Sequence, residues 1–270
     1  MSGARPMSSA RTVGLERHVR ERRAKKPLLL MAHAVVGYPS LDATWTMLEA
    51  MDEAGVDLVE LQLPFTEPIA DGPSFVKANH EAIQAGTAWQ AYFELAARAA
   101  TRFGFPVLFM GYYNSVFRMG LERFCARLAE AGMSGFILAD LPPEEAGELN
   151  AMARACALDP ILIMTQTGSP ARLAEIGRQA SGFVYCTSRK GVTGRRTDLS
   201  HGVGAFLERC RAATALPLGL GFGIKTAADV RELRDRADIA IVGTACLEVW
   251  EERGADGYRQ FLKTLAAETV

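Results

Sequence analysis

Short apolar runs alternate with longer amphipathic stretches along nearly the whole chain of 270 residues. A short apolar run between turn signals predicts a buried strand, and an apolar stripe at helical spacing predicts a helix that covers it. Strands that alternate with helices favour right-handed βαβ units and a parallel sheet. We predict eight such strands, over residues 28–36, 58–63, 106–110, 135–139, 160–164, 183–185, 217–221 and 239–242.

The helical patterns between these strands include residues 41–54, 121–131, 143–157 and 227–236. Eight strand–helix units in this length favour closure into a barrel over an open sheet, because barrels of roughly 250 residues commonly form one domain. We therefore predict an α/β fold, a single (β/α)8 TIM barrel over residues 15–270. An extra N-terminal helix over residues 15–25 is expected before the first strand, and residues 1–14 are expected to form a flexible tail.

Composition argues against several classes of protein. The formal net charge is -1, so no basic excess indicates binding to nucleic acid or to an anionic membrane. The longest apolar run is interrupted by His33 and is too short to span a bilayer. Residues 1–14 lack the apolar core of a signal peptide, so we expect a cytoplasmic protein. The 5 cysteines form no C-x-x-C pair and the 4 histidines have no metal-ligand spacing, so neither a disulfide framework nor a metal site is expected.

The second predicted strand carries two polar side chains on one face. Alternation along the strand directs Glu60 and Gln62 into the barrel, because successive side chains of a strand point to opposite faces. An ionised carboxylate is costly in that position unless it is paired. Enzymes use positioned carboxyl groups to transfer protons. Glu60 is therefore a candidate general acid or base, and the alternative is a structural carboxylate paired with a Lys or Arg.

Two loops that follow strands also carry candidate residues, since TIM barrels place their chemistry at the C-terminal ends of the strands. Residues 64–73 contain 3 prolines, which favour an ordered loop. Asp71 in this loop is either a functional carboxylate or an Asx-turn residue. Residues 186–194 contain 2 glycines and 2 cations, one of them Arg189. They suit a lid over an anionic substrate, or else a plain mobile loop.

Glycines follow the last two predicted strands, at residues 221–224 and 243–245. Glycine lets backbone N–H groups approach a phosphate closely, and a helix N-terminus adds a favourable dipole. Each cluster alone also fits a tight turn. Together, after the two strands where barrels hold phosphate, they predict a phosphate-binding site.

The chain resembles the tryptophan synthase alpha-subunit family over residues 27–250. The strongest match is the segment from Glu60 to Pro73, which reads E-L-Q-L-P-F-T-E-P-I-A-D-G-P. It is similar to the family pattern E-L-G-[IV]-P-[FY]-S-D-P-x-A-D-G-P. A second match, from Ser188 to Gly194, reads S-R-K-G-V-T-G. Supporting matches lie at residues 36–40, 112–114, 139–142, 221–224 and 242–245.

The resemblance implies a carbon–carbon lyase of L-tryptophan biosynthesis that cleaves indole-3-glycerol phosphate to indole and glyceraldehyde 3-phosphate. It implies no metal or organic cofactor in this chain. The implied partner is a tryptophan synthase beta subunit in an alpha2beta2 complex, and pyridoxal phosphate is expected in that partner. The alternatives are a free-standing indole-3-glycerol phosphate lyase, a non-catalytic barrel that activates a beta subunit, and an aldolase for a different phosphate-bearing substrate.

The family's residue roles transfer to matching positions. Glu60 would protonate indole C3 and take a proton from the glycerol hydroxyl, and Asp71 would interact with the indole N–H. Tyr185 would lie near the catalytic Glu60. Thr193, in the same lid as Arg189, would meet Asp71 on closure. The implied phosphate-binding residues are Gly194, Gly223, Gly243 and Thr244.

Two departures from the family pattern bear on substrate and partner. Gln62 stands where the family has Gly, and it is expected either to hydrogen-bond Glu60 or to narrow the indole pocket. Glu67 stands where the family has Asp, on the loop that faces the beta subunit in the family. The longer acid is expected to affect the fit of the partner more than the chemistry.

Overall fold

The computed structural model describes residues 14–187, 202–221 and 223–270. Their strands form one parallel sheet with the order β5-β4-β3-β2-β1-β9-β8-β7-β6. The strands are β1 (Leu29–Val35), β2 (Leu58–Gln62), β3 (Val107–Gly111), β4 (Gly135–Leu138), β5 (Asp159–Ile161), β6 (Ile163–Thr165), β7 (Val184–Thr187), β8 (Leu218–Gly221) and β9 (Ile239–Val242). The two edge strands, β5 and β6, are consecutive in the chain and separated by Leu162 alone, so the sheet curves round into a nearly closed barrel.

The predicted (β/α)8 barrel is confirmed, with one correction to its strands. The segment predicted as a single fifth strand, 160–164, is divided into β5 and β6. β5 pairs with β4, and β6 pairs with β7. The chain therefore changes its pairing partner at Leu162, which is the point where the barrel closes.

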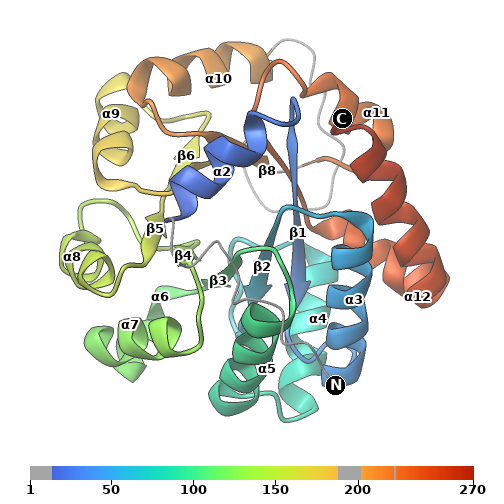
Figure 1. Ribbon diagram of the computed structural model, residues 1–270. Coiled ribbons are helices and arrows are strands. Elements are labelled where there is room, and N and C mark those ends of the chain that lie inside the picture. Colours follow the sequence, from blue (N-terminus) through green and yellow to red (C-terminus); the bar gives the residue numbers. More distant parts are fainter. Residues whose placement is uncertain (1–13, 188–201, 222) are drawn as a thin grey trace, which may run out of the picture.

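Helices surround the strands on the outside of the barrel (Figure 1). They are α2 (Leu15–Arg23), α3 (Leu41–Ala54), α4 (Pro73–Gln84), α5 (Trp89–Arg102), α6 (Tyr113–Met119), α7 (Leu121–Glu130), α8 (Gly147–Ala155), α9 (Pro170–Gln179), α10 (Gly202–Ala213), α11 (Ala227–Glu232) and α12 (Thr244–Ala267). None of the helices in the described ranges is long and apolar enough to cross a bilayer.

Local sequence explains the ends of α3. Its first turn is capped by Ser40, whose Oγ accepts a hydrogen bond from the N–H of Ala43 at 3.0 Å. Its last turn is closed by Gly55 at φ 76°, a left-handed conformation that glycine adopts without steric cost. The helix predicted over 143–157 forms only over Gly147–Ala155, because residues 143–145 make a turn instead.

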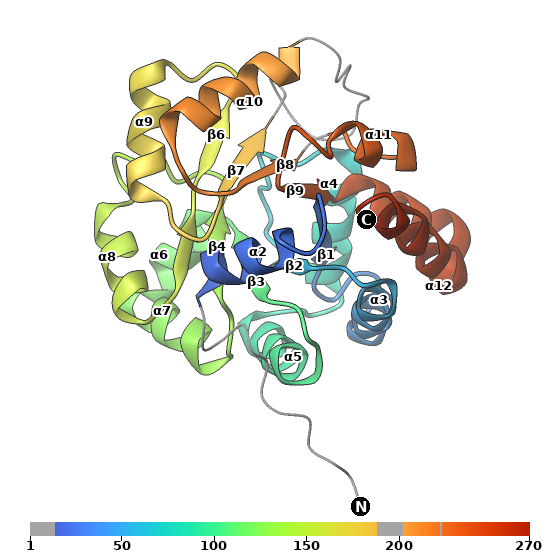
Figure 2. The same ribbon diagram turned by 45° about the horizontal axis from the view of Figure 1, so that its top comes forward.

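Helix α2 covers the N-terminal end of the barrel, and both views show it crossing in front of the strands (Figures 1 and 2). Leu15 and Val19 of this helix are buried in the same cluster as apolar residues of the barrel interior. The interior residues of this cluster are Leu29, Met31, Leu58, Leu108, Ile137, Ile161, Phe183, Ile239 and Ile241. The N-terminal half of the barrel is therefore filled with apolar side chains and closed by α2.

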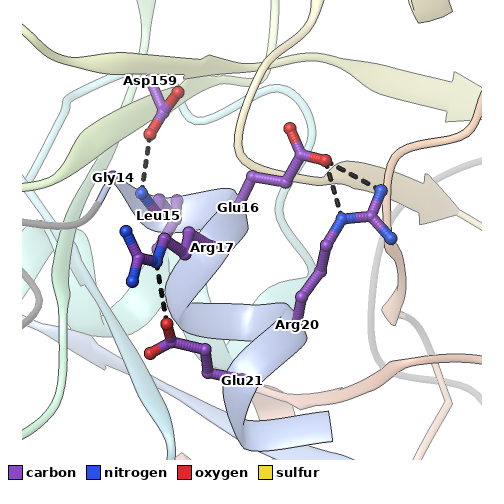
Figure 3. Close-up of a pocket in the computed structure, with 7 residues that line it drawn as sticks. All are labelled: Gly14, Leu15, Glu16, Arg17, Arg20, Glu21 and Asp159. Atoms are coloured by element: carbon purple, nitrogen blue, oxygen red, sulfur yellow. Dashed lines mark hydrogen bonds and ion pairs between the residues drawn. The ribbon is translucent and has the colours of Figure 1, made fainter. Parts of the chain in front are cut away.

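Aspartates at the starts of three strands hold α2 in place. Asp159 accepts the backbone N–H of Leu15 at 3.1 Å, as Figure 3 shows. Asp238 accepts Arg23 Nε at 3.1 Å. Asp57, whose side chain is fully buried, pairs with Arg22 and with Lys26 Nζ at 2.5 Å and also accepts Leu30 N–H at 2.8 Å. Removing one partner of such a buried pair leaves an uncompensated charge, which is strongly destabilising.

We expect Asp57→Asn to lower the free energy of unfolding by about 3 kcal/mol, because the amide keeps the shape of the side chain but leaves Lys26 without its counter-charge. Urea unfolding of wild type and variant measures this loss. The matched control is Asp256→Asn, since Asp256 forms an ion pair with Arg259 but its side chain is fully exposed. The control should keep the wild-type midpoint, and equal midpoints for both variants would contradict the role given to Asp57.

Candidate active site

Three polar side chains lie beyond the apolar layer, toward the C-terminal ends of β1 and β2. His33 of β1 is the register partner of Glu60 on β2, and Gln62 follows on the same face of β2. Their exposed fractions are 6% for His33, 1% for Glu60 and 0% for Gln62. The prediction that Glu60 and Gln62 point inward is consistent with this burial, and His33 joins them from the neighbouring strand.

Hydrogen bonds connect Glu60 to Asp71 through His33 and Gln62. Glu60 Oε1 lies 3.0 Å from His33 Nδ1. His33 Nε2 lies 2.8 Å from Gln62 Oε1. Gln62 Nε2 in turn donates to Asp71 Oδ2 at 2.8 Å. Because an ionised carboxylate only accepts hydrogen bonds, the contact with Asp71 turns the amide oxygen of Gln62 toward His33.

Asn79 of α4 fixes the same amide from a second side. Gln62 Nε2 also donates to Asn79 Oδ1 at 3.4 Å. Asn79 Oδ1 accepts the N–H of Phe65 at 2.9 Å, and Asn79 Nδ2 donates to the carbonyl of Phe75 at 2.8 Å. Both hydrogens and the oxygen of the Gln62 amide therefore have partners, which leaves the amide a single satisfied orientation.

Charge and burial oppose each other at this site. Burial lowers the pKa of His33, but the carboxylate of Glu60, helped by Asp71 and Gln62, outweighs it and the net pKa is raised. Burial raises the pKa of Asp71, although the hydrogen bond from Gln62 acts against it. Glu60 Oε2 is buried and has no hydrogen-bond partner among the described residues. This oxygen is the one free to meet a substrate.

Tyr185 lies on β7 beside glycines of β8. A Cβ atom on Gly221 would lie 2.4 Å from Tyr185 Oη, and one on Gly219 would lie 3.1 Å from the ring of Phe183. The two glycines therefore leave the space that these aromatic rings fill. Burial raises the pKa of Tyr185 well above its ordinary value, and the charges of Glu60 and Asp71 add to this effect. Tyr185 thus keeps its proton and can donate a hydrogen bond.

The loop that carries Asp71 is ordered by its own contacts, as its prolines predict. The N–H of Asp71 donates to the carbonyl of Pro68 at 2.9 Å. The N–H of Ala70 donates to Tyr112 Oη at 3.2 Å, and the Tyr112 ring stacks on Phe65 with centroids 5.1 Å apart. The loop therefore places Asp71, which is 7% exposed, at the end of the hydrogen-bond chain from Glu60.

Candidate phosphate-binding residues follow two adjacent strands, β8 and β9. Gly223 has φ 88°, a conformation that favours glycine. Gly243 precedes α12, which begins at Thr244, so the helix N-terminus faces the same end of the barrel as Gly223. A Cβ atom on Gly243 would meet the Phe75 ring at 3.2 Å. The remaining predicted residues of the lid and the phosphate site, Arg189, Thr193 and Gly194, lie outside the described residues.

Sequence reasoning missed three side chains of this site. The signal for His33 was available, because it shares the alternation of Leu29 and Met31, which point into the barrel. Tyr112 lies within one of the supporting family matches, whereas Asn79 carried no signal in the sequence. The expectation that Gln62 bonds Glu60 directly was wrong, since the ring of His33 stands between them. The described partner of Glu60 is this histidine, and not the Lys or Arg weighed as the structural alternative.

We expect Gly221→Ala to lower the free energy of unfolding by about 1–3 kcal/mol, because its methyl group would displace the Tyr185 ring. Thermal unfolding measures the loss, and near-ultraviolet circular dichroism reports the movement of the tyrosine. Gly204→Ala in α10 is the matched control, since no neighbouring atom lies within 4 Å of the added methyl group. The control should be neutral or stabilising in a helix interior. Two equally stable variants would show that the interior has more room than the contact implies.

Comparison with known proteins gives a consistent result. The family model for the tryptophan synthase alpha chain matches residues 20–269. The tryptophan synthase alpha chain of Syntrophotalea carbinolica is 45% identical over 251 residues, which are 93% of this chain and 99% of the relative. That of Desulforapulum autotrophicum is 44% identical, over 93% of this chain and all of the relative.

Solved structures of the same enzyme share the fold. A tryptophan synthase structure from Mycobacterium tuberculosis superposes with a TM-score of 0.89 at 30% identity and covers 94% of this chain and 97% of the solved chain. A structure of the tryptophan synthase a2b2 complex from Pyrococcus furiosus gives a TM-score of 0.83 at 26% identity, over 90% of this chain and 98% of the solved chain.

Proposed function

Because this chain belongs to the tryptophan synthase alpha chain family, we propose that Glu60, Asp71 and Tyr185 carry out the cleavage of indole-3-glycerol phosphate in its barrel. Members of the family are carbon–carbon lyases that release indole and glyceraldehyde 3-phosphate in L-tryptophan biosynthesis, and this chain is a lyase of that kind. The observation that supports the residue assignment is Glu60, whose buried Oε2 has no partner among the described residues and whose Oε1 is joined to Asp71 by a chain of hydrogen bonds.

The retro-aldol reaction needs one proton at indole C3 and the removal of one from the glycerol hydroxyl. Glu60 delivers the first proton through Oε2, while the carboxylate of Asp71 stabilises the positive charge that develops at the indole N–H. The bond between indole C3 and the glycerol carbon then breaks, and its electron pair restores the indole ring. The hydroxyl proton returns to Glu60 as the aldehyde forms, so the acid is regenerated and the protons balance.

Tyr185 and the glycines supply binding in this proposal. Tyr185 remains protonated, so it donates a hydrogen bond beside Glu60. Gly223, Gly243 and Thr244 hold the phosphate mainly through backbone N–H groups. Gly194, which the resemblance assigns to the phosphate, and the lid residues Arg189 and Thr193 lie outside the described residues.

The chain works with a tryptophan synthase beta subunit, as the alpha chain does in the Pyrococcus furiosus a2b2 complex. This family has no cofactor in the alpha chain, and pyridoxal phosphate belongs to the beta subunit. Glu67 and Ile69 are exposed on the loop after β2, where the family meets that partner. We place the protein in the cytoplasm and assign catalysis to one domain, residues 15–270. The predicted tail lies outside the described residues except for Gly14.

We expect the purified chain to release indole slowly from indole-3-glycerol phosphate, and a tryptophan synthase beta subunit to raise the rate sharply. A coupled assay for indole, with and without the beta subunit, measures both rates. Fast release by the chain alone would instead indicate a free-standing lyase. No release of indole, but stimulation of the beta subunit's own activity, would indicate a non-catalytic barrel. Neither release nor stimulation would indicate a different phosphate-bearing substrate.

We expect Glu60→Gln to lower kcat by about 10²–10⁴-fold while the far-ultraviolet circular dichroism stays unchanged, because the amide cannot supply or receive the reacting proton. Glu67→Gln is the matched control, since it makes the same substitution at an exposed glutamate, seven residues after Glu60. Its kcat without the beta subunit should equal that of the wild type. Turnover by a correctly folded Glu60→Gln variant at the wild-type rate would overturn the assignment of the general acid.

A further inference from the structure

His33 occupies a position that the proposed reaction does not yet explain. Its ring is buried between two elements of the site: Nδ1 faces Glu60 Oε1 at 3.0 Å and Nε2 faces Gln62 Oε1 at 2.8 Å. The ring also packs against Phe75 of α4, with centroids 4.5 Å apart. Every polar atom of the histidine therefore has a partner, and the ring has little freedom to turn.

The amide of Gln62 determines where the protons of His33 lie. Gln62 donates through Nε2 to Asp71 and Asn79, so its oxygen is left to accept from His33. His33 must then carry a hydrogen on Nε2. The remaining contact, between Nδ1 and Glu60 Oε1, requires one proton, either on the carboxyl group or on the ring. If a second proton lay between Nδ1 and Oε1, it would have no acceptor. If no proton lay between these two atoms, their lone pairs would face each other.

We propose that His33 and Gln62 are positioning residues for the cleavage reaction: they hold one proton between Glu60 and His33, turn Glu60 Oε2 toward the substrate, and couple Glu60 to Asp71. This inference rests on the proposed function. Gln62 replaces a family glycine, which has no side chain with which to build this bridge. The chain therefore places a proton-sharing pair beside the carboxylate of Asp71 in a buried site.

The shared proton fits the balance of the reaction. When Glu60 delivers a proton from Oε2 to indole C3, the proton shared between Oε1 and His33 Nδ1 stays in place, so the carboxylate that remains keeps its hydrogen-bond partner. When the hydroxyl proton returns to Glu60 Oε2, the pair recovers the two protons with which it began. No proton has to enter or leave the site during a turnover, and no oxidant or other co-reactant is needed.

Apart from the two carboxylates, the titratable groups that face His33 keep their protons in the range of an assay. Glu60 faces it from β2, Asp71 from the loop after β2, and Cys246 from α12. Burial raises the pKa of Cys246 to about 12. Burial raises the pKa of Tyr185, on β7, well above its ordinary value. Changes near neutral pH therefore do not come from Cys246 or Tyr185.

A titration of the histidine ring by NMR tests the shared proton without any need for activity. In the wild type His33 should titrate above the ordinary histidine value, since Glu60 stabilises its charged form. Glu60→Gln should reduce the proton affinity of His33 roughly tenfold or more. The half-buried His18, on α2 at the opposite end of the barrel, is the internal control and should not change. An unchanged His33 titration in Glu60→Gln would refute the shared proton, whatever the enzyme's activity.

Variants of His33 separate orientation from proton sharing. His33→Phe keeps an aromatic ring against Phe75 but loses both hydrogen bonds, and should lower kcat roughly 10- to 100-fold with a smaller change in KM. His33→Asn offers Glu60 a hydrogen bond but titrates no proton. It should recover part of kcat without restoring the wild-type pH profile. His80→Phe on the exposed face of α4 is the matched control and should leave kcat unchanged. Wild-type kcat and pH profile in His33→Phe would overturn the proposal.

Gln62→Leu tests the coupling to Asp71, because it keeps the bulk of the side chain and removes its amide. The hydrogen bond from Gln62 lowers the pKa of Asp71, so its loss should raise that pKa. Since Asp71 acts as a carboxylate, the acidic limb of kcat/KM should then move to higher pH. If the acidic limb of kcat/KM in Gln62→Leu stays at its wild-type pH, the proposed coupling of Gln62 to Asp71 is wrong. A wild type that releases no indole would count against the proposed function alone, since the NMR titration still tests the pair of His33 and Glu60.

Discussion

The alternation of side chains along closed parallel strands is the constraint on which the rest of this structure depends. Every second residue of a strand points into the barrel, whose interior volume is limited. The size of each interior side chain therefore limits the size of the side chains next to it. Phe183, just before β7, and Tyr185 on β7 fit because the neighbouring residues of β8 are Gly219 and Gly221. The apolar layers fill the N-terminal half under α2, and the described polar side chains of the barrel interior, His33, Glu60 and Gln62, gather in the half where the strands end. The position of the site follows from this division.

Burial in turn requires that the polar half be fully hydrogen-bonded, since an unpaired buried polar group destabilises the fold. Gln62 meets this requirement through His33, Asp71 and Asn79. Of the carboxylate oxygens of Glu60 and Asp71, only Glu60 Oε2 is buried without a partner among the described residues. Glu60 is fixed through Oε1, while Oε2 can accept or donate a hydrogen bond to a ligand. The unpaired oxygen lowers the stability of the fold as long as no ligand is bound.

The sequence predicted the barrel well because its signals are local. Each strand is a short apolar run, and each boundary carries a glycine, a proline or a capping residue such as Ser40. Glu60 and Gln62 were predicted for the same reason, since period-two alternation needs only one strand. Asp71 and the glycines after the last two strands were candidates from their own loops, and the family resemblance supplied their roles. The bond of His33 with Gln62 depends on the register between β1 and β2, which no single segment contains. The break of the fifth strand at Leu162 likewise depends on its two neighbours and not on its own residues.

Gln62 and His33 each supply the hydrogen-bond partner of the other. A substitution at one of the two positions therefore affects the other. A glycine at position 62 would leave His33 Nε2 without its acceptor and Asp71 without its donor. A buried donor that loses its partner destabilises a protein by about 1–3 kcal/mol. An apolar residue at position 33 would equally leave the oxygen of Gln62 unsatisfied. Either change alone is therefore costly, whereas both together remove donor and acceptor at once and can be nearly neutral for folding. The two positions form a unit, and in chains with the family glycine at position 62 an apolar residue is the side chain that position 33 accommodates best.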